Sequence, residues 1–132
     1  PPVAQAIADA TAAFDKQLIF VALAGSPLAA AGQKAGLHVA QEAFADRAYE
    51  ADGALRNRKL AGAMIEDNAL ALAQVIRMVK EGYTLSHDGQ RVAIQADTIC
   101  LHGDTRGAAA RAQFLRNGLE QAGIAVKVQS RK

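Results

Sequence analysis

The sequence predicts an α/β fold with mainly parallel strands. Short apolar stretches of strand length alternate with longer segments of helical period, which is the pattern of βα units. Two of the apolar stretches end directly in ionisable residues, as strands do at the site edge of α/β sheets. The 132 residues fit one small domain, and the apolar fraction of 51% is sufficient for a core.

The first half of the chain alternates between helix and strand signals. Ser26 and Pro27 are a favourable N-cap and first helical residue, and Gly36 is suited to ending the helix that they begin. The apolar run at residues 18–23 is uninterrupted, which is typical of a strand buried on both faces. The elements expected here are a helix at 3–14, a strand at 18–23, a helix at 27–35 and a strand within 37–44.

The second half continues the alternation and adds a hairpin. Asp67 is a suitable N-cap, and Gly82 and Gly123 are suited to ending helices. Asp88-Gly89 is a strong signal for a tight hairpin turn. The elements expected here are a helix at 68–80, hairpin strands at 84–86 and 91–94, a strand at 98–101, a helix at about 106–122 and a last strand at 124–128.

The bulk properties exclude several function classes. The net charge of +2 is small and no Lys/Arg cluster alternates with aromatic residues, so no nucleic-acid partner is expected. No apolar run reaches the roughly 18 residues of a membrane span, and no signal peptide is visible. The single cysteine, Cys100, excludes an internal disulfide, suits a reducing compartment and is expected to be an inert packing residue. Arg131 and Lys132 are expected to be a solvated end.

The most informative segment is the strand end at residues 98–104. His102, Gly103 and Asp104 follow the apolar strand, and an imidazole can move protons near neutral pH or bind a metal or an oxyanion. Gly103 lets the backbone approach a ligand closely, and Asp104 could orient His102 or act as a base. The alternative is that Asp104 or Thr105 only caps the following helix.

A second polar strand end lies at residues 42–50. Arg47 could clamp a substrate carboxylate through two parallel hydrogen bonds, Asp46 could hold Arg47 or serve as acid or base, and Tyr49 offers a phenol. The alternative is a solvated loop with a local ion pair of little energetic weight. The surrounding segment, residues 45–62, is too polar for a core element and long for a connector, and such loops tend to be functional.

Both polar segments follow strands, and parallel strands place their C-terminal ends on one side of a sheet. We therefore expect Asp46, Arg47 and His102 to converge in one crevice, with Asp104 at its rim. A crevice of this kind is the usual ligand site of an open α/β sheet.

The remaining candidates carry weaker signals. Ser26 could bind an anion at a helix N-terminus, although capping is the more common role. His38 at the start of a strand and His87 in the hairpin turn have no metal-ligand spacing with His102, so both are expected to be structural or exposed. The chain contains neither a Gly-Lys-Ser/Thr phosphate loop nor Gly-x-Gly-x-x-Gly, so it offers no nucleotide site of its own.

Two motifs and the segments around them match a known pattern. The first motif is Glu42-Ala43-Phe44-Ala45-Asp46-Arg47-Ala48-Tyr49-Glu50-Ala51-Asp52-Gly53, followed by Leu55 and Arg58. The second joins Ala96-Asp97-Thr98-Ile99-Cys100 to His102-Gly103-Asp104-Thr105. The segment Leu23-Ala24-Gly25-Ser26, the helix from Asp67 to Gly82 and the hairpin around Asp88-Gly89 fit in the same order. Over essentially its whole length the chain resembles the LamB/YcsF family, the A component of prokaryotic 5-oxoprolinase.

The resemblance implies the fold in more detail. Family members are about twice as long as this chain and form an irregular β/α barrel that is related to the TIM barrel and resembles carbohydrate deacetylases. Their N-terminal half carries an acidic strand-end motif that is absent here, and the chain begins with Pro1-Pro2 rather than Met. We therefore expect residues 1–132 to be a single partial domain, the C-terminal half of such a barrel, with an exposed sheet edge where the other half would pair.

The resemblance also implies an activity, as one component of the ATP-dependent ring opening of 5-oxo-L-proline to L-glutamate. The partners would be B and C subunits in the cytoplasm, ATP would be the cofactor of the complete complex, and a metal requirement is left open. The expected site residues are, for catalysis, Asp46, His102 and Asp104 and, for substrate binding, Arg47, Tyr49 and Gly103. The isolated chain is expected to be inactive, and a second copy or another chain is expected to cover the open sheet edge.

Two other functions stay open at this point. The chain could be a non-catalytic scaffold or interaction domain whose polar strand ends bind a partner subunit. It could also be a metal-assisted hydrolase similar to deacetylases, although His102 with Asp97 and Asp104 is a thin ligand set.

Overall fold

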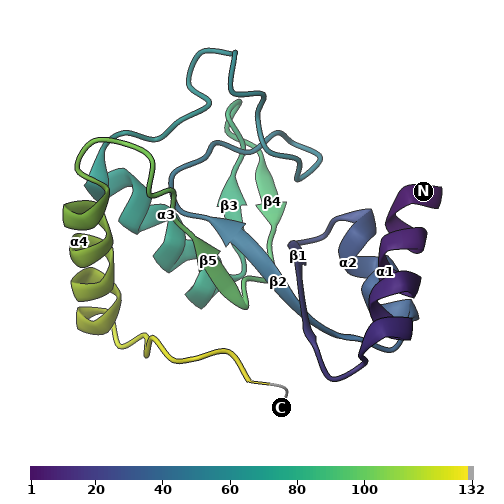
Figure 1. Ribbon diagram of the computed structural model, residues 1–132. Coiled ribbons are helices and arrows are strands. Elements are labelled where there is room, and N and C mark those ends of the chain that lie inside the picture. The colour runs from purple at the N-terminus through teal and green to yellow at the C-terminus, as the bar shows by residue number, and fades with distance from the viewer. Residues whose placement is uncertain (131–132) are drawn as a thin grey trace.

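The computed structural model describes residues 1–130 and has the mixed α/β architecture that the sequence predicts (Figure 1). Its helices are α1 (Pro2–Phe14), α2 (Pro27–Lys34), α3 (Asn68–Glu81) and α4 (Ala108–Gln121). Its strands are β1 (Ile19–Leu23), β2 (His38–Phe44), β3 (Tyr83–Leu85), β4 (Arg91–Ala93) and β5 (Thr98–Cys100). None of these helices is long and apolar enough to cross a lipid bilayer. Arg131 and Lys132, the expected solvated end, lie outside the described residues.

Three of the strands form a parallel sheet in the order β1-β2-β5. At the C-terminal end of β2, Glu42 is in register with Leu23 of β1. Two residues further along, Phe44 is in register with Cys100 of β5. The C-terminal ends of all three strands therefore lie at one edge of the sheet, and the loops that leave them start side by side. The remaining strands, β3 and β4, form a separate antiparallel hairpin, as the turn signal predicts.

Two apolar clusters hold these elements together. In the first, α1 packs on α2, and α2 packs on β1 and β2. The second joins α3, α4 and the hairpin to the segment that follows β2, through Tyr49, Val75, Met78, Val92 and Leu115. Figure 1 shows α1 and α2 on the β1 side of the molecule and α3 and α4 on the β5 side. The sheet thus lies between two helix pairs, and its C-terminal edge faces the long loop between β2 and α3.

The helix ends confirm the signals in the sequence. Ser26 caps α2 by accepting a hydrogen bond from the Ala29 N–H at 3.1 Å. Asp67 caps α3 by accepting one from the Leu70 N–H at 3.0 Å. Gly82 ends α3 in the left-handed conformation, with φ of 72°, which a residue with a side chain rarely adopts.

Two strand predictions are wrong. Residues 124–128 form no strand among the described residues, because no other strand runs beside them, and Val128 is 93% exposed. The first strand is not buried on both faces, because Val21 of β1 is 49% exposed. An uninterrupted apolar run therefore marks β1 as a strand without showing that both of its faces are covered.

Candidate functional site

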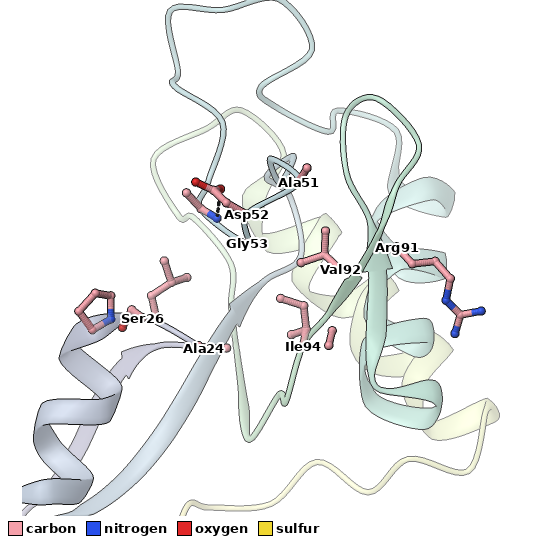
Figure 2. Close-up of a pocket in the computed structure, with 13 residues that line it drawn as sticks. Ala24, Ser26, Ala51, Asp52, Gly53, Arg91, Val92 and Ile94 are labelled. Carbon is pink, nitrogen blue, oxygen red and sulfur yellow. Dashed lines mark hydrogen bonds between the residues drawn. The ribbon is translucent and has the colours of Figure 1, made fainter.

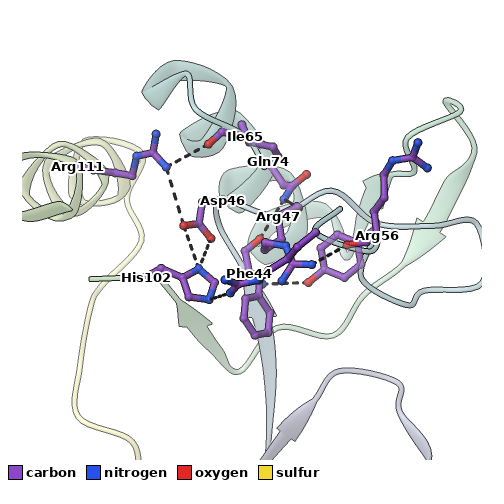
Figure 3. Close-up of polar contacts among 10 residues, drawn as sticks. Phe44, Asp46, Arg47, Arg56, Ile65, Gln74, His102 and Arg111 are labelled. Carbon is purple, nitrogen blue, oxygen red and sulfur yellow. Dashed lines mark hydrogen bonds and ion pairs between the residues drawn. The ribbon is translucent and has the colours of Figure 1, made fainter. Parts of the chain in front are cut away.

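The loops that leave β2 and β5 bring Asp46 and His102 into contact (Figure 3). Nδ1 of His102 lies 3.0 and 3.1 Å from the two carboxylate oxygens of Asp46. The Asp46 side chain is fully buried and that of His102 is 18% exposed, so the carboxylate is shielded while part of the imidazole faces solvent. The Phe44 ring stacks on the imidazole with the ring centroids 5.6 Å apart. The parallel sheet thus brings two of the predicted residues into one site.

A third side chain, Arg58, determines which ring nitrogen of His102 carries the proton. Nη2 of Arg58 lies 3.0 Å from Nε2 of the imidazole. A guanidinium can only donate, so Nε2 accepts, and the ring proton is assigned to Nδ1, which donates to Asp46. The neutral imidazole therefore points a basic nitrogen away from the carboxylate that orients it, which is the arrangement of a general base.

The buried carboxylate of Asp46 has a second cation beside it. Nη1 of Arg111, on α4, lies 3.9 Å from Oδ2 of Asp46. The same guanidinium donates to the Ile65 carbonyl at 3.1 Å and to the Asn68 side chain at 2.8 Å, and it contacts the Glu66 carbonyl oxygen. It ties the end of the long loop to α4 and offsets part of the desolvation cost of the Asp46 charge. Sequence reasoning missed this residue, because it lies within a helix pattern and outside both polar segments.

Arg47 is buried beneath the long loop and is only 6% exposed. Its Nη2 donates to the Arg56 carbonyl at 2.6 Å, and its Nε is buried without a partner among the described residues. Gln74, on α3, donates to the carbonyl oxygens of Phe44 and Arg47 at 3.0 and 2.9 Å. These contacts brace the loop from inside, and the predicted contact of Arg47 with a substrate carboxylate stays a prediction.

Tyr49 lies in the core, where its side chain is fully buried. Its hydroxyl oxygen accepts a hydrogen bond from the Phe44 N–H at 2.9 Å. Burial raises the pKa of the Tyr49 phenol, and the hydrogen bond from Phe44 opposes part of that shift. The view that residues 45–62 are too polar for a core element is therefore wrong for residues 45–49, which are all buried. The predicted substrate contact of Tyr49 stays a prediction.

Gly103 and Asp104 are exposed in the loop that follows His102. A Cβ added at Gly103 would meet no atom within 4 Å, and the Asp104 side chain makes no hydrogen bond or ion pair among residues 1–130. The N-cap of α4 is Gly107 and makes no side-chain cap hydrogen bond, so the alternative that Asp104 or Thr105 caps this helix is wrong. The predicted functional roles of Gly103 and Asp104 stay predictions.

The weaker candidates have structural surroundings. Ser26 is the cap of α2, His38 is half-buried at the start of β2, and the exposed His87 donates its backbone N–H to the Tyr49 carbonyl at 2.8 Å. Burial raises the pKa of the half-buried Cys100 thiol. In the described part of the chain, no three His, Cys, Asp or Glu side chains gather as a group that could hold a metal ion.

A hollow of about 470 Å³ opens at the C-terminal end of β1 (Figure 2). Its walls are residues 23–27 between β1 and α2, residues 51–54 of the long loop and residues 91–94 of the hairpin. Neither Asp46 nor His102 lines it. The polar pair and the hollow are therefore separate features of the same edge of the sheet.

Comparison with known proteins shows which proteins the chain is similar to. The LamB/YcsF family model matches residues 1–132. The chain is 55% identical to the A component of 5-oxoprolinase from Chloroflexus aggregans over 125 residues, which are 95% of this chain and 50% of that relative. It is 49% identical to the A component of 5-oxoprolinase from Acinetobacter baylyi over 124 residues, or 94% of this chain and 49% of that relative.

A solved structure shares the fold as well as the sequence. The lactam utilization protein from Thermus thermophilus superposes with a TM-score of 0.84 and 43% identity, over 94% of this chain and 49% of that one. The chain thus spans about half the length of the relatives that it matches. Because the family model matches all 132 residues, the chain belongs to the LamB/YcsF family.

Proposed function

We propose that this chain supplies part of the A component of a 5-oxoprolinase. With B and C subunits, this enzyme opens the ring of 5-oxo-L-proline to give L-glutamate, with consumption of ATP. The observation that carries the proposal is the Asp46–His102 pair at the strand ends. The support from comparison is the sequence identity of 49–55% to relatives named as the A component of 5-oxoprolinase. Because the reaction consumes ATP, its proposed location is the cytoplasm.

The proposal includes the larger fold. Residues 1–132 would form the C-terminal half of an irregular β/α barrel of the TIM type, related to deacetylases. The parallel order β1-β2-β5 and the match to about half the length of each relative support this arrangement. In such a barrel, the C-terminal ends of the strands face the site, which is where Asp46 and His102 meet.

The chemistry requires a base and an acid at one place. A five-membered lactam is unstrained, and its amide resonance makes hydrolysis slow. In the proposed step, Nε2 of His102 accepts a proton as water adds to the lactam carbonyl carbon. The same nitrogen then donates that proton to the ring nitrogen as the C–N bond breaks. Asp46 holds the Nδ1 proton and stabilises the imidazolium between the two transfers.

ATP, bound elsewhere in the complete enzyme, would supply the driving force for this energetically poor hydrolysis. The residues of this chain do not fit a nucleotide, because the sequence has neither a Gly-Lys-Ser/Thr phosphate loop nor Gly-x-Gly-x-x-Gly. We therefore assign ATP binding to the partner subunits and derive no step through it.

The other predicted residues take two kinds of role in this proposal. Gly103 and Asp104 follow His102 on an exposed loop, where both can face a bound substrate. Arg47 and Tyr49 are buried, and they act on the site by supporting the segment that carries Asp46.

The test is a coupled assay of the complete protein that contains this chain, with its B and C partners, measuring glutamate formed and ATP consumed. His102→Ala should lower kcat roughly a hundredfold or more, because the proton carrier is lost. Asp46→Asn should also lower kcat with little change in KM, because an amide neither carries the charge nor favours the Nδ1–H form. His87→Ala, which changes an exposed histidine in the hairpin, is the matched control.

Unchanged turnover in both site variants would remove the pair from the mechanism and favour the scaffold function. The 132-residue chain alone should form no glutamate, because half of the proposed barrel would be missing and the charges would be screened by water. Turnover by the chain alone would show that the other half is dispensable.

A further inference from the structure

Arg58 has surroundings unlike those of the other cations near the site. It is exposed, and its Nη2 lies 3.0 Å from Nε2 of His102. No carboxylate lies within ion-pair distance of Arg58 among residues 1–130, although the guanidinium has five N–H donors. A cation that is held only by a neutral acceptor and faces solvent is available to an anion.

The neighbouring arginines are already occupied. Arg47 is buried and donates to a carbonyl oxygen. Arg56 pairs with Glu50 at 2.9 Å. Arg111 is held by the residues at the start of α3 and lies beside Asp46. Of the guanidinium groups around the site in the described chain, Arg58 is therefore the one that combines exposure, contact with the proposed base and the absence of an anionic partner.

We propose that Arg58 binds the carboxylate of the substrate and that this contact frees the base. The inference rests on the proposed function and names the residue that recognises the acidic group of 5-oxoproline. A two-pronged guanidinium–carboxylate pair is stronger than a bond to a neutral imidazole, so the substrate draws the guanidinium away from Nε2. The lone pair of Nε2 is then open to a water molecule.

The exposure and loose attachment of Arg58 favour a role at the substrate carboxylate over a role at the reacting carbonyl oxygen. Stabilising a developing oxyanion requires donors that are held rigidly before the reaction. Arg58 is a long, exposed side chain in a loop, with one contact to hold it. Such a side chain suits a charge that is present in the substrate from the start, so its loss should weaken binding and leave the chemical step largely intact.

The closing experiment compares Arg58 with the adjacent cation Lys59, which is also exposed. In the complete protein with its partners, Arg58→Ala should raise KM for 5-oxoproline by roughly 10- to 100-fold, with kcat within a few-fold. Arg58→Lys should recover part of the loss, and guanidinium ion in the buffer should partly rescue Arg58→Ala. Lys59→Ala should match the wild type in each respect. Inhibition by 2-pyrrolidinone, the same lactam ring without the carboxylate, should be no weaker in Arg58→Ala.

Calorimetric titration with 5-oxoproline separates this inference from the proposed function, because it needs no turnover. Weaker binding of 5-oxoproline by Arg58→Ala but not by Lys59→Ala supports the role of Arg58, even if no glutamate is ever formed. A failure to form glutamate would overturn the proposed function alone. Equal binding by the wild type and Arg58→Ala overturns the role of Arg58, whatever the turnover. A reduced kcat with unchanged KM and unchanged binding overturns it as well, by placing the guanidinium at the transition state. If 5-oxoproline does not bind to the wild-type protein, both the role of Arg58 and the proposed function are overturned.

Discussion

Tyr49 shows how the polar groups of the segment after β2 are satisfied. Its ring is fully buried in the larger apolar cluster, and its hydroxyl oxygen accepts the Phe44 N–H, which the end of β2 leaves free. Gln74 then binds the Phe44 carbonyl from the other side. The position of Asp46, two residues beyond Phe44, therefore depends on buried hydrogen bonds as well as on apolar packing.

The first prediction removes the Tyr49 hydroxyl. Tyr49→Phe should lower the free energy of unfolding by about 1–3 kcal/mol, because the Phe44 N–H is left buried without an acceptor. Chemical denaturation measures the change. Tyr83→Phe is the control, because no hydrogen bond within residues 1–130 involves that hydroxyl and the change should stay within about 0.5 kcal/mol. An equal loss in both variants would contradict the prediction.

The second prediction concerns Asp88 in the hairpin turn. The hydroxyl of Ser86 and the side-chain amide of Gln90 donate to its carboxylate, and these bonds, that of Ser86 first, lower the pKa of Asp88. Because the folded pKa lies below the unfolded value of about 4, the bonds stabilise the hairpin above that pH. The stabilisation is lost as the pH falls through the folded pKa.

A carboxyl-detected NMR titration checks this directly. The midpoint of Asp88 should lie below that of an unfolded chain, and Ser86→Ala should move it upward because its strongest donor is gone. A midpoint that does not move in Ser86→Ala would show that the hydrogen bond has no effect on the charge.

At this scale the sequence predicts part of the site. Asp46 and His102 could be expected to meet, because each follows a strand of a parallel sheet. The contact of Arg58 with His102 could not be predicted, because it depends on how the long loop after β2 folds back over the strand ends. The burial of Arg47 and Tyr49 could not be predicted either. In the sequence alone a polar segment resembles a solvated loop, because its hydrogen-bond partners lie on other elements.

Among the elements, α2 shows how close packing depends on a small residue. Gly32 is buried in α2 where the helix lies against the sheet. A Cβ at this position would meet two carbons of the Phe20 ring at 2.6 and 2.9 Å and a Val39 methyl at 2.9 Å. The absence of a side chain therefore lets the helix approach β1 and β2 closely.

The third prediction is that Gly32→Ala destabilises the fold. Alanine gains about 1 kcal/mol of helix propensity over glycine. Overlap with a rigid ring costs about 1–3 kcal/mol, so the net result should be a loss of up to about 2 kcal/mol in thermal or chemical unfolding. Gly103→Ala, which would meet open space, should change stability by less than about 0.5 kcal/mol. A stabilised Gly32→Ala variant would show that α2 can shift away from the sheet.

The elements themselves were largely predictable, and the exceptions have a common physical cause. Ser26 and Asp67 act as caps because capping is a local interaction that three or four residues determine. The segment at residues 124–128 has the apolar content of a strand and forms none, because a strand exists only beside another strand. Local signals therefore predict helix ends well, whereas strand formation depends on what the rest of the molecule provides.

On the scale of the whole molecule, the sheet has an open side. β1 pairs only with β2 in the described chain, so one edge of β1 carries unpaired backbone groups. Large apolar side chains are exposed in β1 and in the residues that precede it: Val21 at 49%, Leu18 at 42% and Phe14, at the end of α1, at 85%. Since the chain spans about half the length of its relatives, this side is where we expect a further β/α segment or a second chain to pack.

The last prediction follows from this edge. The isolated 132-residue chain should sediment as a dimer or larger assembly at micromolar concentration, because an open, apolar strand edge is a template for another strand. Val21→Lys should shift it toward the monomer, since a charged side chain on the edge strand opposes such pairing. Leu70→Lys is the matched control: Leu70 is 64% exposed on α3, on the β5 side of the molecule, and its replacement should leave association unchanged. If the wild type sediments as a monomer, the β1 edge is not an association surface; if both variants dissociate equally, the effect comes from net charge rather than from β1.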